Sequence, residues 1–169
     1  MNSCRTLSAA LILLAATAAA HDTPHENSAQ RLLALINHIR AHGANCGGRL
    51  HPPAPPLQWN AQLAQAATAH AQEMAGRNRL SHQSGDGRSM EQRIAHTDYP
   101  YRAVGENILG GADTPEEAAR LWFESPAHCK NIMDADYTET GIARARNTQS
   151  KYQTYWVQDF GGRAKQQQK

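Results

Sequence analysis

The sequence carries almost no excess of charge of either sign. Its 17 basic and 15 acidic residues leave a formal net charge of +2 with the histidines neutral. A protein that binds nucleic acid usually has a strong basic excess, so the composition argues against a nucleic-acid partner. The sequence also lacks an H-E-x-x-H pattern and a G-x-S-x-G pattern. Their absence argues against two common types of hydrolase.

Long apolar runs are also scarce. The single such run covers residues 7–19, with Arg5 before it and small alanines up to Ala20 at its end. This pattern predicts a secretory signal peptide over residues 1–20, cleaved near Ala20. The apolar run is too short for a transmembrane helix. We therefore expect a secreted or periplasmic protein with no membrane span.

Cleavage at that point would leave 149 of the 169 residues, enough for one domain with a proper core. We expect a single domain over residues 21–162 and a monomer. The closing residues 163–169 are rich in Gln and Lys. We expect them to form a disordered polar tail.

Cysteine is rare, with three residues in the whole chain. Cys4 falls in the predicted signal peptide, which leaves Cys46 and Cys129. An even pair in an exported protein favours a disulfide, and closing a loop of 83 residues would stabilise the fold by about 4–5 kcal/mol at most. The alternative is one buried and one exposed free thiol.

Hydrophobic periodicity and capping residues predict helices in the first part of the chain and strands at its end. Asn27 or Ser28 caps a first helix, Asn60 caps a second, and Thr114-Pro115 starts a third. The predicted strands are residues 102–109, 138–146 and 152–160. Aromatic residues point both ways along the last strand, as expected of a central strand. The fold class is α+β, a three-layer α-β-α sandwich with a central, mainly antiparallel sheet.

Three short stretches carry polar residues suited to chemistry: Ser81-His82-Gln83-Ser84, Gly105-Glu106-Asn107-Ile108 and Trp122-Phe123-Glu124-Ser125-Pro126-Ala127-His128-Cys129. Strand alternation places Glu106 on the same face as Val104 and Ile108. A carboxylate between apolar neighbours needs a partner to be buried, and histidine is a natural one.

The order of these stretches, with Gly141 and the closing Tyr155-Trp156-Val157-Gln158-Asp159-Phe160-Gly161, resembles the CAP superfamily. This superfamily includes cysteine-rich secretory proteins, antigen 5 and pathogenesis-related 1 proteins, and the likeness to its bacterial branch is closer. It covers about residues 30 to 162. The resemblance implies an α-β-α sandwich with a cavity lined by two histidines and two acidic residues. His82, Glu106 and His128 match three of these positions, and Glu124 lies one residue before the fourth.

Two imidazoles beside a carboxylate can bind a divalent metal such as zinc, so His82, His128 and Glu106 are candidate metal ligands. The alternative is a polar cluster that fixes the loops and binds no metal. His70 lies on the apolar stripe of the second helix, and we expect it to be a core or rim residue.

Three functions remain open. The first is a non-enzymatic module that binds a metal or a small ligand, such as a lipid or a component of the cell envelope. The second is a metal-assisted hydrolase or protease with Glu106 or Glu124 as general base. The third is a structural envelope protein without a ligand. A His/Glu cluster without a recognised nucleophile favours a non-enzymatic role.

Overall fold

The computed structural model describes residues 24–163. The predicted signal peptide and residues 164–169 of the predicted tail lie outside the described residues. The elements follow in the order α1 Pro24–His42, β1 Ala44–Cys46, β2 Arg49–His51, β3 Gln58–Trp59, α2 Ala61–Arg77, α3 Met90–Ala95, β4 Tyr101–Gly110, α4 Pro115–Glu124, α5 Pro126–Met133, β5 Glu139–Arg146 and β6 Thr154–Arg163.

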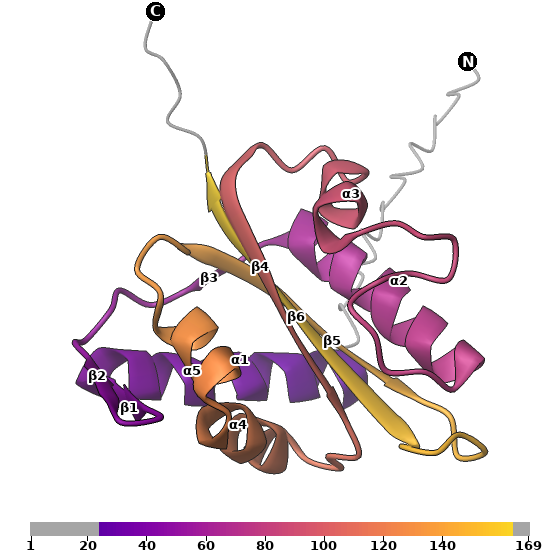
Figure 1. Ribbon diagram of the computed structural model, residues 1–169, viewed down its shortest axis with the longest axis horizontal. Helices are drawn as coiled ribbons and strands as arrows, with labels where there is room; N and C mark the ends of the chain where they lie inside the picture. Colours follow the sequence, from indigo (N-terminus) through magenta and orange to yellow (C-terminus); the bar gives the residue numbers. More distant parts are fainter. Residues whose placement is uncertain (1–23, 164–169) are drawn as a thin grey trace, which may run out of the picture.

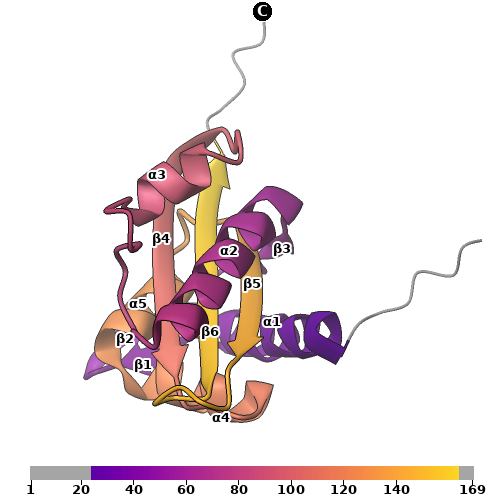
Figure 2. The same ribbon diagram turned by 90° about the vertical axis from the view of Figure 1, so that its right-hand side faces the viewer.

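The main sheet has the strand order β3-β5-β6-β4. Only the short β3–β5 pair is parallel, and the other pairs are antiparallel. Figure 1 shows α2 and α3 on one face of this sheet and α1, α4 and α5 on the other, and Figure 2 shows the same layers from the side. The predicted three-layer sandwich with a mainly antiparallel sheet is confirmed.

The inner strand β6 is buried along almost its whole length. Trp156 and Phe160 pack into the core beneath α1, α4 and α5, whereas Tyr155 and Val157 pack against α2. These alternating contacts are the two covered faces that the aromatic pattern predicts. The strand extends through Arg163, one residue past the expected end of the domain.

The helix starts agree with the capping signals in two of three cases. Asn60 accepts hydrogen bonds from the backbone N–H groups of Gln62 and Leu63, and Thr114 accepts one from Glu117. The prediction for the first helix was wrong, because α1 begins at Pro24. Proline suits the first turn of a helix, where its missing N–H costs nothing.

Two small pieces of sheet were not predicted, namely the β1–β2 hairpin and β3. The hairpin is tied to the helical layer by the disulfide between Cys46 on β1 and Cys129 on α5, with Cα atoms 5.4 Å apart. The expected pairing of these cysteines is confirmed. Within residues 24–163, no helix is long and apolar enough to cross a membrane.

Candidate functional site

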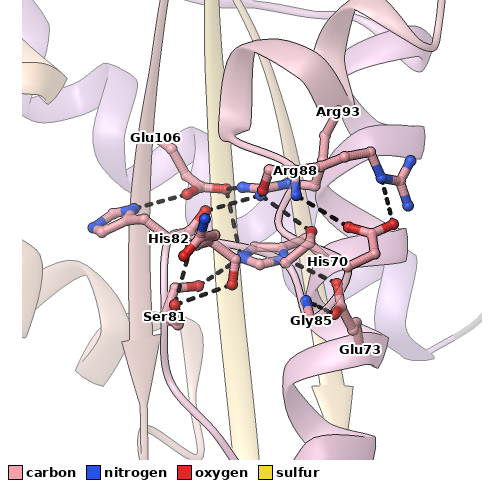
Figure 3. A network of polar contacts seen from close by, with 11 residues as sticks. His70, Glu73, Ser81, His82, Gly85, Arg88, Arg93 and Glu106 are labelled. Atoms are coloured by element: carbon pink, nitrogen blue, oxygen red, sulfur yellow. Dashed lines mark hydrogen bonds and ion pairs between the residues drawn. The ribbon is translucent and has the colours of Figure 1, made fainter.

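The candidate site lies along β4 on the side of the sheet that carries α2 and α3. Each element contributes one side chain: α2 supplies His70, the loop after α2 supplies His82, α3 supplies Arg93 and β4 supplies Glu106. Figure 3 shows these side chains converging on the Glu106 carboxylate. Asp159 faces Glu106 from the neighbouring strand β6.

The Glu106 carboxylate is the centre of this cluster, and its side chain is 1% exposed. One oxygen, Oε1, lies 2.7 Å from Nδ1 of His82, and the other, Oε2, accepts a hydrogen bond of 2.5 Å from Nη2 of Arg93. A buried carboxylate is stable only when it is paired and hydrogen-bonded. The expected pairing of Glu106 with a histidine is present, and Arg93 is a further partner that the sequence pattern does not indicate.

The same arginine fixes the loop that carries His82. Its Nη1 atom donates to the backbone oxygen of His82 at 2.8 Å. Nε2 of His70 lies 2.8 Å from the backbone oxygen of Ser81, and because a carbonyl only accepts, this nitrogen carries the proton. Burial lowers the pKa of His70, the charge of Glu106 acts in the opposite direction, and the charge of Arg93 lowers it further. His70 is therefore a neutral histidine that anchors the loop, in line with the expected core or rim role.

Asp159 is a second buried carboxyl group beside Glu106. Gly111 lies opposite Thr154 and donates its N–H to the Thr154 carbonyl, and Glu106 lies opposite Asp159 in the same register. Hydrogen-bonded and non-hydrogen-bonded pairs alternate along two antiparallel strands, so Glu106 and Asp159 form a non-hydrogen-bonded pair. The side chains of such a pair approach each other most closely. Asp159 is fully buried, and neither of its carboxyl oxygens has a hydrogen-bond partner among the described residues. Burial, and then the charge of Glu106, raise the pKa of Asp159 well above its usual value, so its neutral form is favoured beside the Glu106 carboxylate.

His128 reaches the site from α5 on the other side of β4. Nδ2 of Asn107 donates to its backbone oxygen at 3.2 Å. Its own Nδ1 is buried and has no hydrogen-bond partner among residues 24–163. Burial, and then the charge that His82 can carry, lower the pKa of His128. His128 is thus a neutral imidazole with one unused nitrogen.

Glu124 is not brought to this site. It is exposed at the end of α4, where both its carboxylate oxygens pair with Nη1 of Arg120, one turn earlier, at 2.8 and 2.9 Å. The helix continues through Glu124 before Ser125 leaves it. The side chain therefore keeps the helical direction that points it to solvent.

An open cleft of about 380 Å³ lies directly beside His82 and Glu106. Its remaining lining comes from the segment between His82 and α3 and from the first turn of that helix: Gln83, Ser89, Met90 and Glu91. The His82 side chain is 60% exposed, although its Nδ1 is held by the buried carboxylate. Since Nδ1 donates to Glu106, Nε2 is the ring nitrogen left for the cleft, and it accepts a hydrogen bond when the ring carries a single proton.

Glu106, one of the three candidate zinc ligands, already has two partners. Both oxygens of Glu106 are already engaged, one of them by the positive charge of Arg93. Within the described part of the chain, no three His, Cys, Asp or Glu side chains are grouped so that they could hold a metal ion. Zinc normally needs at least three protein ligands. Metal binding by His82, His128 and Glu106 stays a prediction.

The hydrogen bonds of the nearby serine hydroxyls bear on whether His82 could activate a nucleophile. The hydroxyl of Ser81 donates to the Gln83 carbonyl, and that of Ser84 accepts from Arg93. Within residues 24–163, no hydroxyl is hydrogen-bonded to His82. A nucleophile activated by a histidine base needs such a contact.

A family model described as the cysteine-rich secretory protein family, CAP, matches residues 33–160. The uncharacterized protein YkwD of Bacillus subtilis is 32% identical over 108 residues, which cover 64% of this chain and 40% of that protein. The uncharacterized membrane protein YlbC of the same organism is 28% identical over 134 residues, 79% of this chain and 34% of that protein. The chain thus spans less than half the length of these relatives.

Two solved structures share the fold. An extracellular protein containing a SCP domain from Bacillus anthracis has a TM-score of 0.68 and 24% identity, covering 82% of this chain and 41% of that one. An outer surface protein from Borrelia burgdorferi has the same TM-score, 0.68, with 20% identity, covering 82% of this chain and 95% of that one. At these identities the likeness establishes the architecture, and function must be argued from the site.

Proposed function

The chain belongs to the CAP family of cysteine-rich secretory proteins, and on that premise we propose that it is an exported protein that binds a small polar ligand in the cleft beside His82 and Glu106, without catalysing a reaction. Export is supported by the signal-like residues 1–20, by the Cys46–Cys129 disulfide and by the extracellular and outer-surface relatives.

The observation that carries the proposal is a half-exposed imidazole held rigidly over an open cleft. Glu106 and Arg93 are almost completely buried, so the support of His82 does not depend on solvent. Nε2 of His82 is then an oriented acceptor, and Glu91 adds a carboxylate at the cleft wall. Such a site favours a ligand that presents a hydrogen-bond donor or a positive charge.

Within the described residues, no hydroxyl group is hydrogen-bonded to the His82 ring, and this separates the proposal from a hydrolase. General-base catalysis by Glu106 would require an oxygen free to take a proton. Both of its oxygens are engaged with His82 and Arg93. Glu124, the other candidate base, is paired with Arg120 at the surface.

Thermal unfolding tests the proposal. The protein is screened against small amines, amino acids, sugars and zinc chloride, with a chelator as reference, alongside His82→Ala and a matched control, His96→Ala. His96 is also exposed but lies at the end of α3.

We expect a polar compound to raise the unfolding temperature of the wild type and the control by a few degrees and to have no effect on His82→Ala. A rise with zinc alone, lost in His82→Ala and His128→Ala, would replace the proposal by a metal site. Turnover of an ester or peptide that depends on Glu106 would replace it by a hydrolase. No response to any compound would leave a structural role.

A further inference from the structure

A cavity of about 740 Å³ lies on the opposite edge of the sheet from β4. It is lined by one face of α2, by β5, by Trp59 of β3 and by Ala29 of α1. Its α2 residues are Ala64, Thr68, Gln72, Ala75 and Gly76. Neither His82 nor Glu106 contributes to it. Figure 2 shows the reason for the groove: β3 is short and covers only one end of β5, with α2 and α1 on either side of the rest.

The open part of β5 is a free strand edge. β3 pairs only with Glu139 and Thr140, and the chain leaves the sheet at Asn60, whose N–H donates to the Thr140 carbonyl. Backbone groups alternate between the two sides of a strand, so Arg144 and Arg146 direct their N–H and C=O groups to the same side as Thr140. Within residues 24–163, no backbone hydrogen bond reaches these groups.

The two arginine side chains on this edge also lack a carboxylate partner. Arg146 is exposed, Arg144 is half-buried, and neither forms an ion pair among the described residues. The Arg144 guanidinium lies over the ring of Trp156, 5.4 Å from its centroid, while its Nε atom is buried with no hydrogen-bond partner. Two cations therefore flank an unpaired backbone edge.

We propose that this groove binds an extended acidic peptide of a partner protein, which adds to the sheet as a strand beside β5. The backbone of the peptide pairs with the free N–H and C=O groups of Arg144 and Arg146. Its carboxylates pair with the two guanidinium groups, and small residues on α2 leave room for its side chains. This is recognition by strand addition, in which the backbone provides affinity and the side chains provide specificity.

The groove suits a peptide in its dimensions as well as in its charge. The edge beyond β3 runs from Ile142 to Arg146, a length of about 15 Å for an extended chain. Ile142 is almost fully buried and closes the inner end. A peptide of about five residues would therefore fill the open part of the edge, and it would contact neither the His82 cleft nor the residues around it.

The test uses a fluorescent seven-residue peptide of alternating valine and glutamate, with a valine–lysine peptide of the same length as its counterpart. We expect the glutamate peptide to bind the wild type, as measured by fluorescence anisotropy, and Arg146→Glu to weaken this binding about tenfold while favouring the lysine peptide. Arg49→Glu, the same charge change on the exposed β2 hairpin, should leave binding unchanged.

The backbone part of the proposal has its own variant. Arg146→Pro removes an N–H that faces the free edge and leaves the β5–β6 ladder intact, since that N–H does not face β6. We expect this variant to fold, as judged by its unfolding temperature, and to lose peptide binding.

Amide hydrogen exchange gives the decisive readout. In the free protein the N–H groups of Arg144 and Arg146 should exchange rapidly and those of Ala143 and Ala145, which face β6, slowly. The glutamate peptide should protect the first pair. Binding without this protection would overturn strand addition. Protection that appears when the protein alone is concentrated would overturn the partner peptide in favour of self-association through this edge.

Discussion

The two buried carboxyl groups at positions 106 and 159 should substitute for one another as counter-ions of Arg93. In the wild type, Glu106 pairs with Arg93, and burial and the charge of Glu106 oppose the ionisation of Asp159 by raising its pKa. Glu106→Gln removes that charge. Asp159 can then ionise and compensate the guanidinium, because Arg93 already acts to lower its pKa.

The expected magnitudes follow from the cost of an uncompensated buried charge. The Arg93 side chain is 5% exposed, and removing the partner of such a group costs about 3–5 kcal/mol. We expect the double variant Glu106→Gln/Asp159→Asn to lose this amount. Glu106→Gln alone should lose about 1–2 kcal/mol less because of Asp159. Asp159→Asn alone should raise the unfolding free energy at neutral pH, because it removes a group whose raised pKa costs stability there.

The assay is urea unfolding followed by tryptophan fluorescence, which reports on the fully buried Trp122 and Trp156. The pH dependence provides a second readout. A carboxyl group with a raised folded pKa binds its proton more tightly in the native state, so its contribution to stability falls as pH rises from about 4 through the raised pKa. The difference between the wild type and Asp159→Asn should show this fall.

Two results would refute the reasoning. Equal losses in Glu106→Gln and in the double variant would mean that Asp159 does not compensate Arg93. A loss of about 3–5 kcal/mol in Asp159→Asn alone would mean that Asp159 is already ionised and paired in the wild type.

Three further predictions concern stability. Arg40→Leu should lower the unfolding free energy by about 3 kcal/mol in urea, because Arg40 is fully buried and donates to four backbone carbonyls that would lose their partner; Arg40→Lys should recover only part of the loss. Cys46→Ser/Cys129→Ser should lower it by up to about 4–5 kcal/mol, measured in the same way, because the bridge closes a loop with a separation of 83 residues. Burial lowers the pKa of both His70 and His128, so stability should fall as pH drops below about 6.5, and His128→Gln should make this fall shallower in unfolding curves taken between about pH 5 and 8.

The features that were predictable from the sequence depend on neighbours along the chain. The Asn60 cap and the Thr114-Pro115 start involve backbone groups two or three residues away. The two covered faces of β6 follow from simple alternation. The β1–β2 hairpin was missed because its strands are only three residues long. The pair Gly47-Gly48, with φ of 64° and 93°, is a hairpin-turn signal that could have identified it.

The parts of the site that were missed depend on contacts between distant segments. Arg93 lies on a six-residue helix, and nothing in its local pattern indicates that it points at Glu106. The Glu106–Asp159 pair depends on the register of β4 against β6, which the sequence does not state. An apolar strand that contains Asp159 between Val157 and Phe160 was nevertheless a usable signal, because a buried carboxyl group in such a strand needs a special environment.

The most direct test of the central claim is a nuclear magnetic resonance titration of the protein, labelled with ¹⁵N, with the compounds that raise its unfolding temperature. We expect the largest shift changes at the His82 ring, with Nδ1 protonated toward Glu106 and Nε2 responding to the ligand, and smaller changes at Gln83 and Met90. Changes confined to other surfaces, or the same changes in His82→Ala, would contradict the assignment of this cleft as the binding site.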